Sequence, residues 1–213
     1  NNTYIAAPRI AARTSVLIKE AAEILRGGGL VALPTETVYG LGANALDGRA
    51  VARVFAAKGR PQFNPLIVHV ASLSQIDALI TRKPAQLKKL APLWPGPLSV
   101  VLPANCQRVP SVVRAGLKTV AVRIPAHALL RKLIKKVGPL AAPSANLSGR
   151  PSPTRAQHVE DDLGKAFPVL DGGRCKKGVE STVIALSDDG WVLLRSGALA
   201  VEKIQKVLGP ARV

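Results

Sequence analysis

Apolar residues along this 213-residue chain follow two periodicities. Repeats of three or four positions predict amphipathic helices, and short apolar runs bounded by Gly, Pro or polar residues predict buried strands. The predicted helices span residues 15–26, 48–58, 74–80, 85–90, 128–137, 155–163 and 201–208. The predicted strands span residues 30–33, 66–70, 98–102, 119–124, 140–142, 167–170, 182–186 and 191–194.

Helices and strands alternate without a Gly/Ser-rich linker or an internal repeat. This order predicts a single α/β domain built on a twisted, mixed sheet. We expect residues 1–14 to be a lead-in, residues 15–208 to form the domain and residues 209–213 to be a tail. The strand order cannot be derived from the pattern.

The composition is that of a globular protein, with 47% hydrophobic and 20% charged residues. No apolar run approaches the roughly 20 residues that a membrane span needs. The start of the chain lacks the layout of a signal peptide. Cys106 and Cys175 fit neither a metal motif nor a disulfide scaffold, so we expect a reducing, cytoplasmic location and no contact with a membrane.

The formal net charge of +17 predicts a polyanionic partner, either a nucleic acid or the phosphates of a nucleotide. Aromatic residues make up only 3%, whereas surfaces that stack single-stranded bases need several of them. The charge therefore suits phosphate contacts better than base reading. For the scattered basic pairs, solvated helix faces are an equally good explanation.

Four segments combine a strand end or helix end with small, Pro or hydroxyl residues, at residues 34–42, 58–69, 143–154 and 178–183. Ligands bind at such strand ends in open α/β sheets. Lys58 and Arg60 can converge on an anion, and Arg123 inside an apolar strand needs an anionic partner from the protein or from a ligand. Taken singly, each segment also allows a polar turn, and His69 can be a structural histidine.

Several catalytic motifs are absent from the sequence. There is no Gly-x-Ser-x-Gly, no His-Glu-x-x-His, no Gly-x-Gly-x-x-Gly after a strand and no Walker A motif. Three histidines and two distant cysteines do not make a zinc site. The remaining Lys, Arg, Ser, Thr and Asn side chains suit positioning and charge stabilisation in a phosphoryl reaction.

Seven motifs then occur in a characteristic order. They are Pro-Thr-Glu-Thr-Val-Tyr-Gly-Leu-Gly from residue 34, Lys-Gly-Arg-Pro from 58, Asn-Pro-Leu from 64, Trp-Pro-Gly-Pro from 94, Val-Arg-Ile-Pro from 122, Ala-Pro-Ser-Ala-Asn-Leu-Ser-Gly from 142 and Glu-Ser-Thr-Val from 180. With them the chain resembles the YrdC-type threonylcarbamoyl-AMP synthase family from about Ser15 to Leu208. The resemblance implies a single YrdC-like domain, with a twisted open mixed sheet flanked by helices around a basic concave cavity.

The resemblance also implies a reaction, in which L-threonine, bicarbonate or CO2, and ATP give threonylcarbamoyl-AMP and pyrophosphate. Mg²⁺ is expected with ATP, held mainly by phosphate oxygens. A downstream tRNA threonylcarbamoyl-transferase system would use the product to make threonylcarbamoyladenosine. Contact with tRNA or double-stranded RNA is a further expectation.

The implied site residues fall into three groups. The family's four-residue catalytic signature matches Lys58, Arg60, Ser144 and Asn146. Positions that hold L-threonine match Thr35, His69, Arg123, Ala142 and Ser181. Positions around ATP match Arg60, Asn64, Thr119, Ser144, Ser152 and Arg195. No metal-ligating side chain is implied.

Two other readings remain open. One is an RNA-binding module that uses the same basic cavity, suggested by the charge of +17. The other is a carbamoyl-transfer domain of a hydrogenase-maturation protein, but the sequence lacks the acylphosphatase and zinc-finger segments of those proteins. Longer family members carry a second, C-terminal domain. Because this chain contains no Met and stops at Val213, we expect either a single-domain member or the catalytic part of a longer protein.

Overall fold

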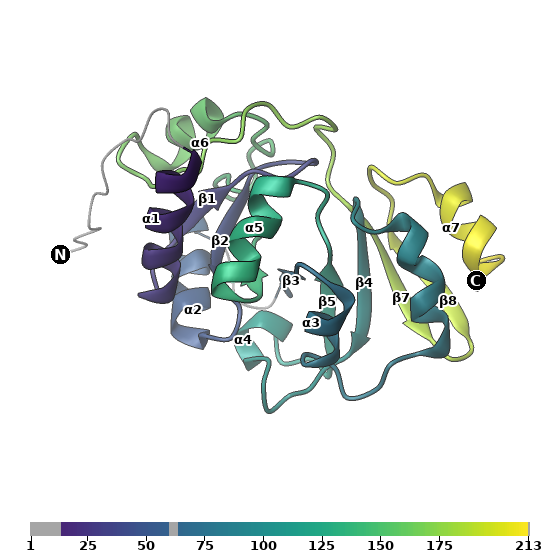
Figure 1. The fold of residues 1–213 in the computed structure, drawn as a ribbon. Helices are drawn as coiled ribbons and strands as arrows, with labels where there is room; N and C mark the ends of the chain where they lie inside the picture. Colours follow the sequence, from purple (N-terminus) through teal and green to yellow (C-terminus); the bar gives the residue numbers. More distant parts are fainter. Residues whose placement is uncertain (1–13, 60–63, 213) are drawn as a thin grey trace.

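Strands from both ends of the chain form one open sheet in the computed structural model, which describes residues 14–59 and 64–212 and the side chains from residue 18 onward. The sheet has eight strands in the order β1-β2-β6-β3-β5-β4-β7-β8 (Figure 1). In chain order they are β1 (Val31–Leu33), β2 (Gly40–Asn44), β3 (Ile67–His69), β4 (Leu98–Pro103), β5 (Thr119–Arg123), β6 (Leu140–Ala141), β7 (Thr182–Ser187) and β8 (Gly190–Arg195).

The sheet is mixed, as the sequence predicts. Strand β3 pairs with β5 and β4 pairs with β7 in parallel, while the other neighbours are antiparallel. The two-residue strand β6 lies between β2 and β3, where it joins the N-terminal hairpin to the rest of the sheet. The predicted α/β class and mixed open sheet are therefore confirmed.

The helices lie close to their predicted positions. They are α1 (Thr14–Arg26), α2 (Gly48–Lys58), α3 (Leu73–Asp77), the 3₁₀ helix η1 (Ala85–Leu93), α4 (Ser111–Arg114), α5 (Ala128–Val137), α6 (Ala156–Leu163) and α7 (Val201–Leu208). The short helix α4 was not predicted, and α3 ends three residues earlier than expected. None of the described helices has the length and apolarity needed to cross a lipid bilayer.

Helix α2 shows how the local sequence delivers a functional side chain. Asp47 caps its start, because the carboxylate accepts hydrogen bonds from the backbone N–H groups of Arg49 and Ala50 at 2.9 and 3.2 Å. Gly59, at a φ of +60°, ends it in the left-handed region. Lys58 is thereby placed in the last turn, on the buried face of the helix.

One predicted strand is absent, and one observed strand was not predicted. Residues 167–170 form only an isolated parallel bridge between Ala32 and Val169. The structure also has β2, which lies within the candidate segment 34–42 and was not predicted as a strand. Its Gly40 and Gly42 lower the propensity for a strand. A Cβ atom on Gly42 would collide with the side chain of Leu33, so the hairpin β1–β2 requires glycine there.

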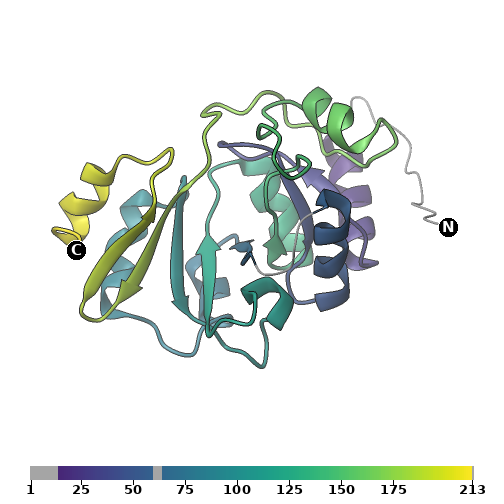
Figure 2. The same ribbon diagram turned by 180° about the vertical axis from the view of Figure 1, so that it is seen from behind.

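Apolar side chains pack in two buried clusters. The smaller cluster joins α1 and α5, which lie side by side on one face of the sheet, to β1 (Figure 1). The larger cluster contains the inner faces of α2, η1 and α7 and the central strands. Seen from behind, β4, β5, β7 and β8 present a face that none of the described helices crosses (Figure 2). The candidate site lies at one end of these strands.

Candidate functional site

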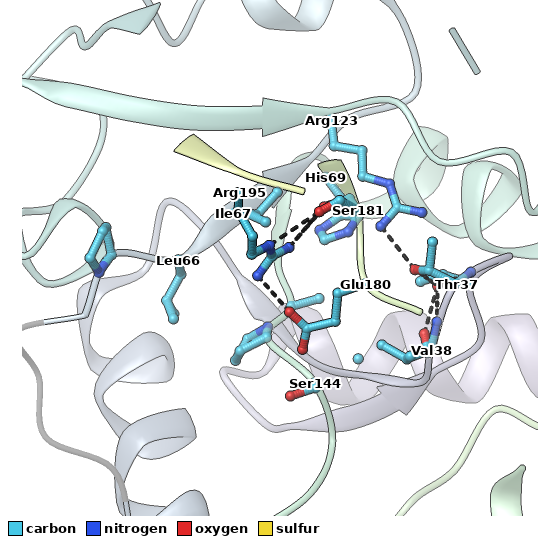
Figure 3. Close-up of a pocket in the computed structure, with 15 residues that line it drawn as sticks. Thr37, Val38, Leu66, Ile67, His69, Arg123, Ser144, Glu180, Ser181 and Arg195 are labelled. Carbon is cyan, nitrogen blue, oxygen red and sulfur yellow. Dashed lines mark hydrogen bonds and ion pairs between the residues drawn. The ribbon is translucent and has the colours of Figure 1, made fainter. Parts of the chain in front are cut away.

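A pocket lies where the ends of several strands and the loops that follow or precede them meet (Figure 3). It holds about 570 Å³ of space, including the open solvent at its mouth. Its described walls come from the turn after β1, the start of β2, the segment leading into β3, the end of β5, the loop after β6, the start of β7 and the end of β8. The lining residues are Thr35, Thr37, Val38, Gly40, Pro65, Leu66, Ile67, His69, Arg123, Ala142, Pro143, Ser144, Glu180, Ser181 and Arg195.

The turn after β1 is held by its own hydroxyl groups. The Thr35 hydroxyl donates to the carbonyl oxygen of Val38 at 2.6 Å and accepts from the backbone N–H groups of Thr37 and Val38, each at 3.0 Å. The Thr35 and Thr37 hydroxyl oxygens are 2.8 Å apart. The Thr35 hydroxyl is thus engaged in shaping the turn that forms one wall of the pocket.

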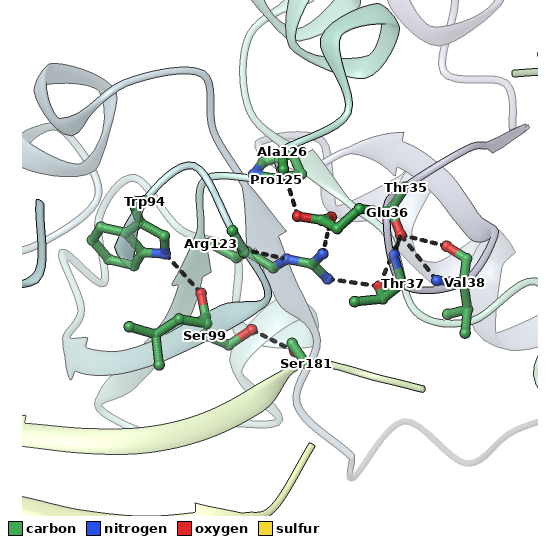
Figure 4. A network of polar contacts seen from close by, with 12 residues as sticks. Thr35, Glu36, Thr37, Val38, Trp94, Ser99, Arg123, Pro125, Ala126 and Ser181 are labelled. Atoms are coloured by element: carbon green, nitrogen blue, oxygen red, sulfur yellow. Dashed lines mark hydrogen bonds and ion pairs between the residues drawn. The ribbon is translucent and has the colours of Figure 1, made fainter. Parts of the chain in front are cut away.

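Arg123, the last residue of β5, has a partner for each guanidinium nitrogen (Figure 4). Its Nε donates to the carbonyl oxygen of Gly96 at 3.2 Å, its Nη1 donates to the Thr37 hydroxyl at 3.1 Å, and its Nη2 forms an ion pair with Glu36. Burial lowers the pKa of Arg123, and the negative charge of Glu36 opposes this shift. The expected anionic partner of this strand arginine is therefore a protein side chain.

His69, the last residue of β3, is a buried, neutral member of the pocket wall. It is 3% exposed, and its Nδ1 has no hydrogen-bond partner among the described residues. Burial and then the charge of Arg123 lower the pKa of His69 to about 3. An uncharged imidazole at this position adds no positive charge to the pocket wall.

A second ion pair closes another wall of the pocket. Arg195, at the end of β8, pairs with Glu180 and donates from Nη2 to the carbonyl oxygen of Ser181 at 2.8 Å. Glu180 also accepts a hydrogen bond from the Ser152 hydroxyl at 3.2 Å. The Ser181 hydroxyl lies 2.8 Å from that of Ser99, so its position is fixed from the neighbouring strand β4.

Lys58 connects α2 to the loop after β6. Its Nζ donates to the carbonyl oxygen of Asn146 at 2.6 Å and to that of Ser144. The Asn146 amide donates to the carbonyl oxygens of Leu147 and Arg150, while its Oδ1 is buried without a partner among the described residues. Lys58 and Asn146 thus set the path of the Pro-Ser-Ala-Asn loop, which presents Ser144 to the pocket.

Gly40 allows this loop to approach strand β2. A Cβ atom on Gly40 would lie 3.0 Å from the Cβ of Ala142, which is tighter than ordinary packing. Gly40 also forms an isolated antiparallel bridge with Ser144. The start of β2 and the serine loop are therefore held together directly.

The structure brings many of the predicted site residues together. All five predicted threonine positions line the pocket, as do two of the predicted ATP positions, Ser144 and Arg195. Other predicted positions lie nearby: Lys58 and Asn146 contact the pocket loop, Ser152 contacts Glu180, and Asn64 precedes Pro65 in the lining. Arg60 lies outside the described residues.

Thr119 is another predicted position that the described lining does not include. It is the first residue of β5 and pairs with Pro103 at the opposite end of the strand from Arg123. The two are four residue steps apart along the extended strand, or about 13 Å. This placement does not test a role toward an extended nucleotide, so that role stays a prediction.

Sequence analysis gave no role to Glu36, Thr37 or Glu180, although it noted these residues within two of the candidate segments. The signal that could have found Glu36 was the need of Arg123 for an anion. Glu180 is the one carboxylate among the described lining residues. In the described part of the chain, no three His, Cys, Asp or Glu side chains gather to hold a metal ion.

Comparison with known proteins gives a consistent picture. A family model named Sua5/YciO/YrdC, described as "Telomere recombination", matches residues 23–197. A threonylcarbamoyl-AMP synthase of Pyrococcus abyssi (strain GE5 / Orsay) is 55% identical over 199 residues, which cover 92% of this chain and 58% of that protein. A threonylcarbamoyl-AMP synthase of Bacillus subtilis (strain 168) is 51% identical over 199 residues, with the same shares of 92% and 58%.

The fold agrees with these relatives. The crystal structure of P. abyssi Sua5 complexed with L-threonine matches with a TM-score of 0.89 and 53% identity, over 96% of this chain and 60% of that one. This chain therefore spans about 58% of the length of the two curated relatives. The family model, the relatives and the matching fold together show that the chain belongs to the Sua5/YciO/YrdC family.

Proposed function

We propose that this chain is an L-threonylcarbamoyladenylate synthase, a nucleotidyltransferase that forms threonylcarbamoyl-AMP and pyrophosphate from L-threonine, bicarbonate or CO2, and ATP. One observation carries the proposal: the five positions expected to hold L-threonine, which lie between residues 35 and 181 in the sequence, all line one pocket. The names of the relatives from P. abyssi and B. subtilis, and the threonine complex of P. abyssi Sua5, support the same activity.

In the proposed complex, the carboxylate of L-threonine binds Arg123. A guanidinium carries five N–H donors, and the three contacts with described residues leave two for a ligand. The amine must lose its proton to attack CO2, so neutral neighbours favour the reactive form. His69, with its pKa of about 3, is such a neighbour, and the Ser181 hydroxyl is a second.

The chemistry then has two steps. The amine nitrogen forms a bond to the carbon of CO2 and releases a proton, which gives a carbamate. A carbamate oxygen next attacks the α-phosphorus of ATP, and the bond from this phosphorus to the bridging oxygen breaks as pyrophosphate leaves. Arg195, at the pocket wall, can stabilise the growing charge, and Arg60 has the same proposed role.

In the proposed reaction, Lys58 orients a loop of the pocket through hydrogen bonds to backbone carbonyl oxygens. Its Nζ is bound to the Ser144 and Asn146 carbonyl oxygens, so it orients the loop that carries the Ser144 hydroxyl. Alignment of the two reacting groups supplies much of the rate in such a site. We therefore assign Lys58 and Asn146 to the shape of the loop and Ser144 to contact with the phosphates.

Mg²⁺ would accompany ATP and neutralise charge on its phosphates. The described lining offers one carboxylate, that of Glu180, and no cluster of three ligands. Such a donor set suits a Mg²⁺ ion held mainly by phosphate oxygens and water, with at most one ligand from the protein. Dependence of turnover on added Mg²⁺ tests this assignment.

The proposal is tested by measuring pyrophosphate release with ATP, L-threonine and bicarbonate, and with each omitted in turn. We expect release only with all three. Pyrophosphate release without L-threonine would contradict the assignment. Substituting L-serine tests substrate choice, and we expect a preference for threonine of about 10-fold to 200-fold, the usual discrimination for one methyl group.

Contact with RNA is a second proposed property. Helix α5 exposes Lys132, Lys135 and Lys136 on one face, which suits contacts to phosphates of a tRNA or of double-stranded RNA. In the pocket, by contrast, Arg123 and Arg195 are each paired with a glutamate. If RNA binds α5, the charge reversals Lys132→Glu and Lys135→Glu should weaken it without changing pyrophosphate release. RNA binding that persists at about 0.5 M salt, with no ATP turnover, would favour the RNA-binding reading.

The product would be consumed by a downstream tRNA threonylcarbamoyl-transferase system. Cys106 and Cys175 are free thiols, which fits a reducing compartment, and we propose the cytoplasm.

A further inference from the structure

We propose that Glu36 is a positioning residue that holds Arg123 in the orientation needed to bind the carboxylate of the amino-acid substrate. The inference rests on the proposed function, because it presumes an amino acid in this pocket. Glu36 does not line the pocket. It would act through Arg123, which does.

Each carboxylate oxygen of Glu36 contacts a different residue at or after the C-terminal end of β5 (Figure 4). Oε1 pairs with Nη2 of Arg123, and Oε2 accepts from the backbone N–H of Ala126 at 2.6 Å. The carboxylate therefore fixes the arginine side chain relative to the backbone three residues further along the chain. The side chains of Glu36 and Arg123 are 9% and 4% exposed, so little water competes for these contacts.

The backbone around Glu36 is also held by a third wall of the pocket. The carbonyl oxygen of Glu36 accepts from the N–H of Lys177 at 2.9 Å, and that of Thr37 accepts from the N–H of Gly178 at 3.0 Å. This strand-like contact leads directly into Glu180 and Ser181. Glu36 thus lies at the junction of the segments that carry Thr35, Arg123 and Ser181.

The contacts of Arg123 determine which of its donors remain for a ligand. Nε is used by Gly96, one N–H of Nη1 by Thr37, and one N–H of Nη2 by Glu36. One N–H of Nη1 and one N–H of Nη2 then remain, and paired guanidinium N–H groups are the donors that a carboxylate recognises. Loss of the Nη2 contact would let the guanidinium turn about the other two, which would misalign this pair.

A rival role for Glu36 is simple charge neutralisation, and it predicts the opposite result. If Glu36 only offset the charge of Arg123, removing its charge would strengthen binding of a substrate carboxylate. If Glu36 positions Arg123, replacing one of its acceptor oxygens weakens that binding, because the glutamine NH2 would face either Arg123 or the N–H of Ala126 as a second donor.

The test uses Glu36→Gln, Arg123→Lys and the double variant, with Asp77→Asn as the matched control. Asp77 forms an exposed ion pair with Lys83 at 2.8 Å, so this change removes the same charge outside the pocket. We expect Glu36→Gln to raise the KM for L-threonine about 10-fold, with less than about 2-fold change in the KM for ATP. The double variant should be no worse than Arg123→Lys alone, because Glu36 acts through that residue.

A second readout separates positioning from general damage to the fold. L-Threoninamide lacks the carboxylate, so its inhibition constant should change little in Glu36→Gln. The preference for threonine over the amide should therefore be about 10-fold smaller in the variant than in the wild type. Glu36→Asp keeps the charge but is shorter, and it should show a smaller loss of the same kind. If Glu36→Gln does not fold, the Glu36→Asp kinetics decide the question.

The outcomes distinguish the two proposals. An unchanged or lowered KM for L-threonine in an active, folded Glu36 variant would overturn the positioning role while leaving the proposed function intact. Additive losses in the double variant would overturn it too. Absence of threonine-dependent pyrophosphate release from the wild-type chain would overturn both.

Discussion

Replacing His69 with asparagine should flatten the dependence of stability on pH. The wild-type imidazole is buried beside Arg123, and its pKa falls from an ordinary 6.5 to about 3. Between these two pH values the unfolded chain binds a proton at His69 that the folded chain does not bind. The free energy of unfolding therefore rises with pH across this window and is lost again on acidification.

The size of the effect follows from the shift. One pH unit within the window is worth about 1.4 kcal/mol for one group. Between pH 7 and pH 5 the wild-type chain should lose about 2 kcal/mol of unfolding free energy because of His69 alone. Below pH 3 no further loss arises from this group, and above pH 6.5 its contribution is constant.

The assay is urea denaturation of both proteins at about pH 7, 6 and 5, which spans the upper part of the window. The amide side chain introduced by His69→Asn cannot titrate, while every other group is the same in both proteins and cancels in the difference. The quantity to compare is the change of the wild-type-minus-variant difference with pH, since the absolute stability of the variant will also reflect lost packing. Parallel profiles would show that the imidazole is not held neutral, and the assignment of His69 as an uncharged pocket wall would then be wrong.

Three further predictions follow from other contacts. Lys58→Met should lower turnover by about 100-fold, a typical cost of disordering a group that stabilises the transition state. It should also lower the melting temperature, because two backbone carbonyl groups lose their hydrogen-bond donor. Turnover near that of the wild type would contradict this role of Lys58. Gly197→Ala should destabilise the chain in thermal melts and impair pyrophosphate release, because the added Cβ would collide with the backbone of Ser181. The control Gly48→Ala should be tolerated in the same melts, because its Cβ would meet its nearest neighbour at 3.4 Å. Tyr39→Phe should lower the free energy of unfolding, measured by urea denaturation, by about 1–2 kcal/mol. The Tyr39 hydroxyl donates to the carbonyl oxygen of Gly173 and accepts from the N–H of Gly172, and phenylalanine loses both bonds. An unchanged free energy of unfolding would show that water replaces these bonds.

Periodicity predicted the helices and most strands well, because their apolar faces repeat clearly. It missed β2, where the strand consists of Gly, Leu, Gly, Ala and Asn and owes its conformation to close packing against Leu33 and the loop at Ala142. It placed a strand at residues 167–170, where an apolar run packs beside Ala32 through a single bridge. In both segments tertiary contacts, rather than local propensity, decide the structure.

The site was predictable in part for a similar reason. Motif order pointed to residues that the fold brings to one pocket, including His69 and Ser181. What a single sequence could not supply was the pairing of charges. Glu36 and Glu180 were visible as acidic residues, but only the sheet order reveals that each faces an arginine from a different strand.

The strand order has a consequence for how the molecule folds. The pocket draws residues from the turn after β1, near the start of the chain, and from the end of β8, near its other end. Within the described sheet, the two-residue strand β6 joins the β1–β2 side to the other strands. Contacts between residues so distant in sequence close large loops, which slows folding. The pocket should therefore form late, at the same step as the complete sheet. A ligand that binds there would stabilise the whole chain cooperatively rather than one lobe of it.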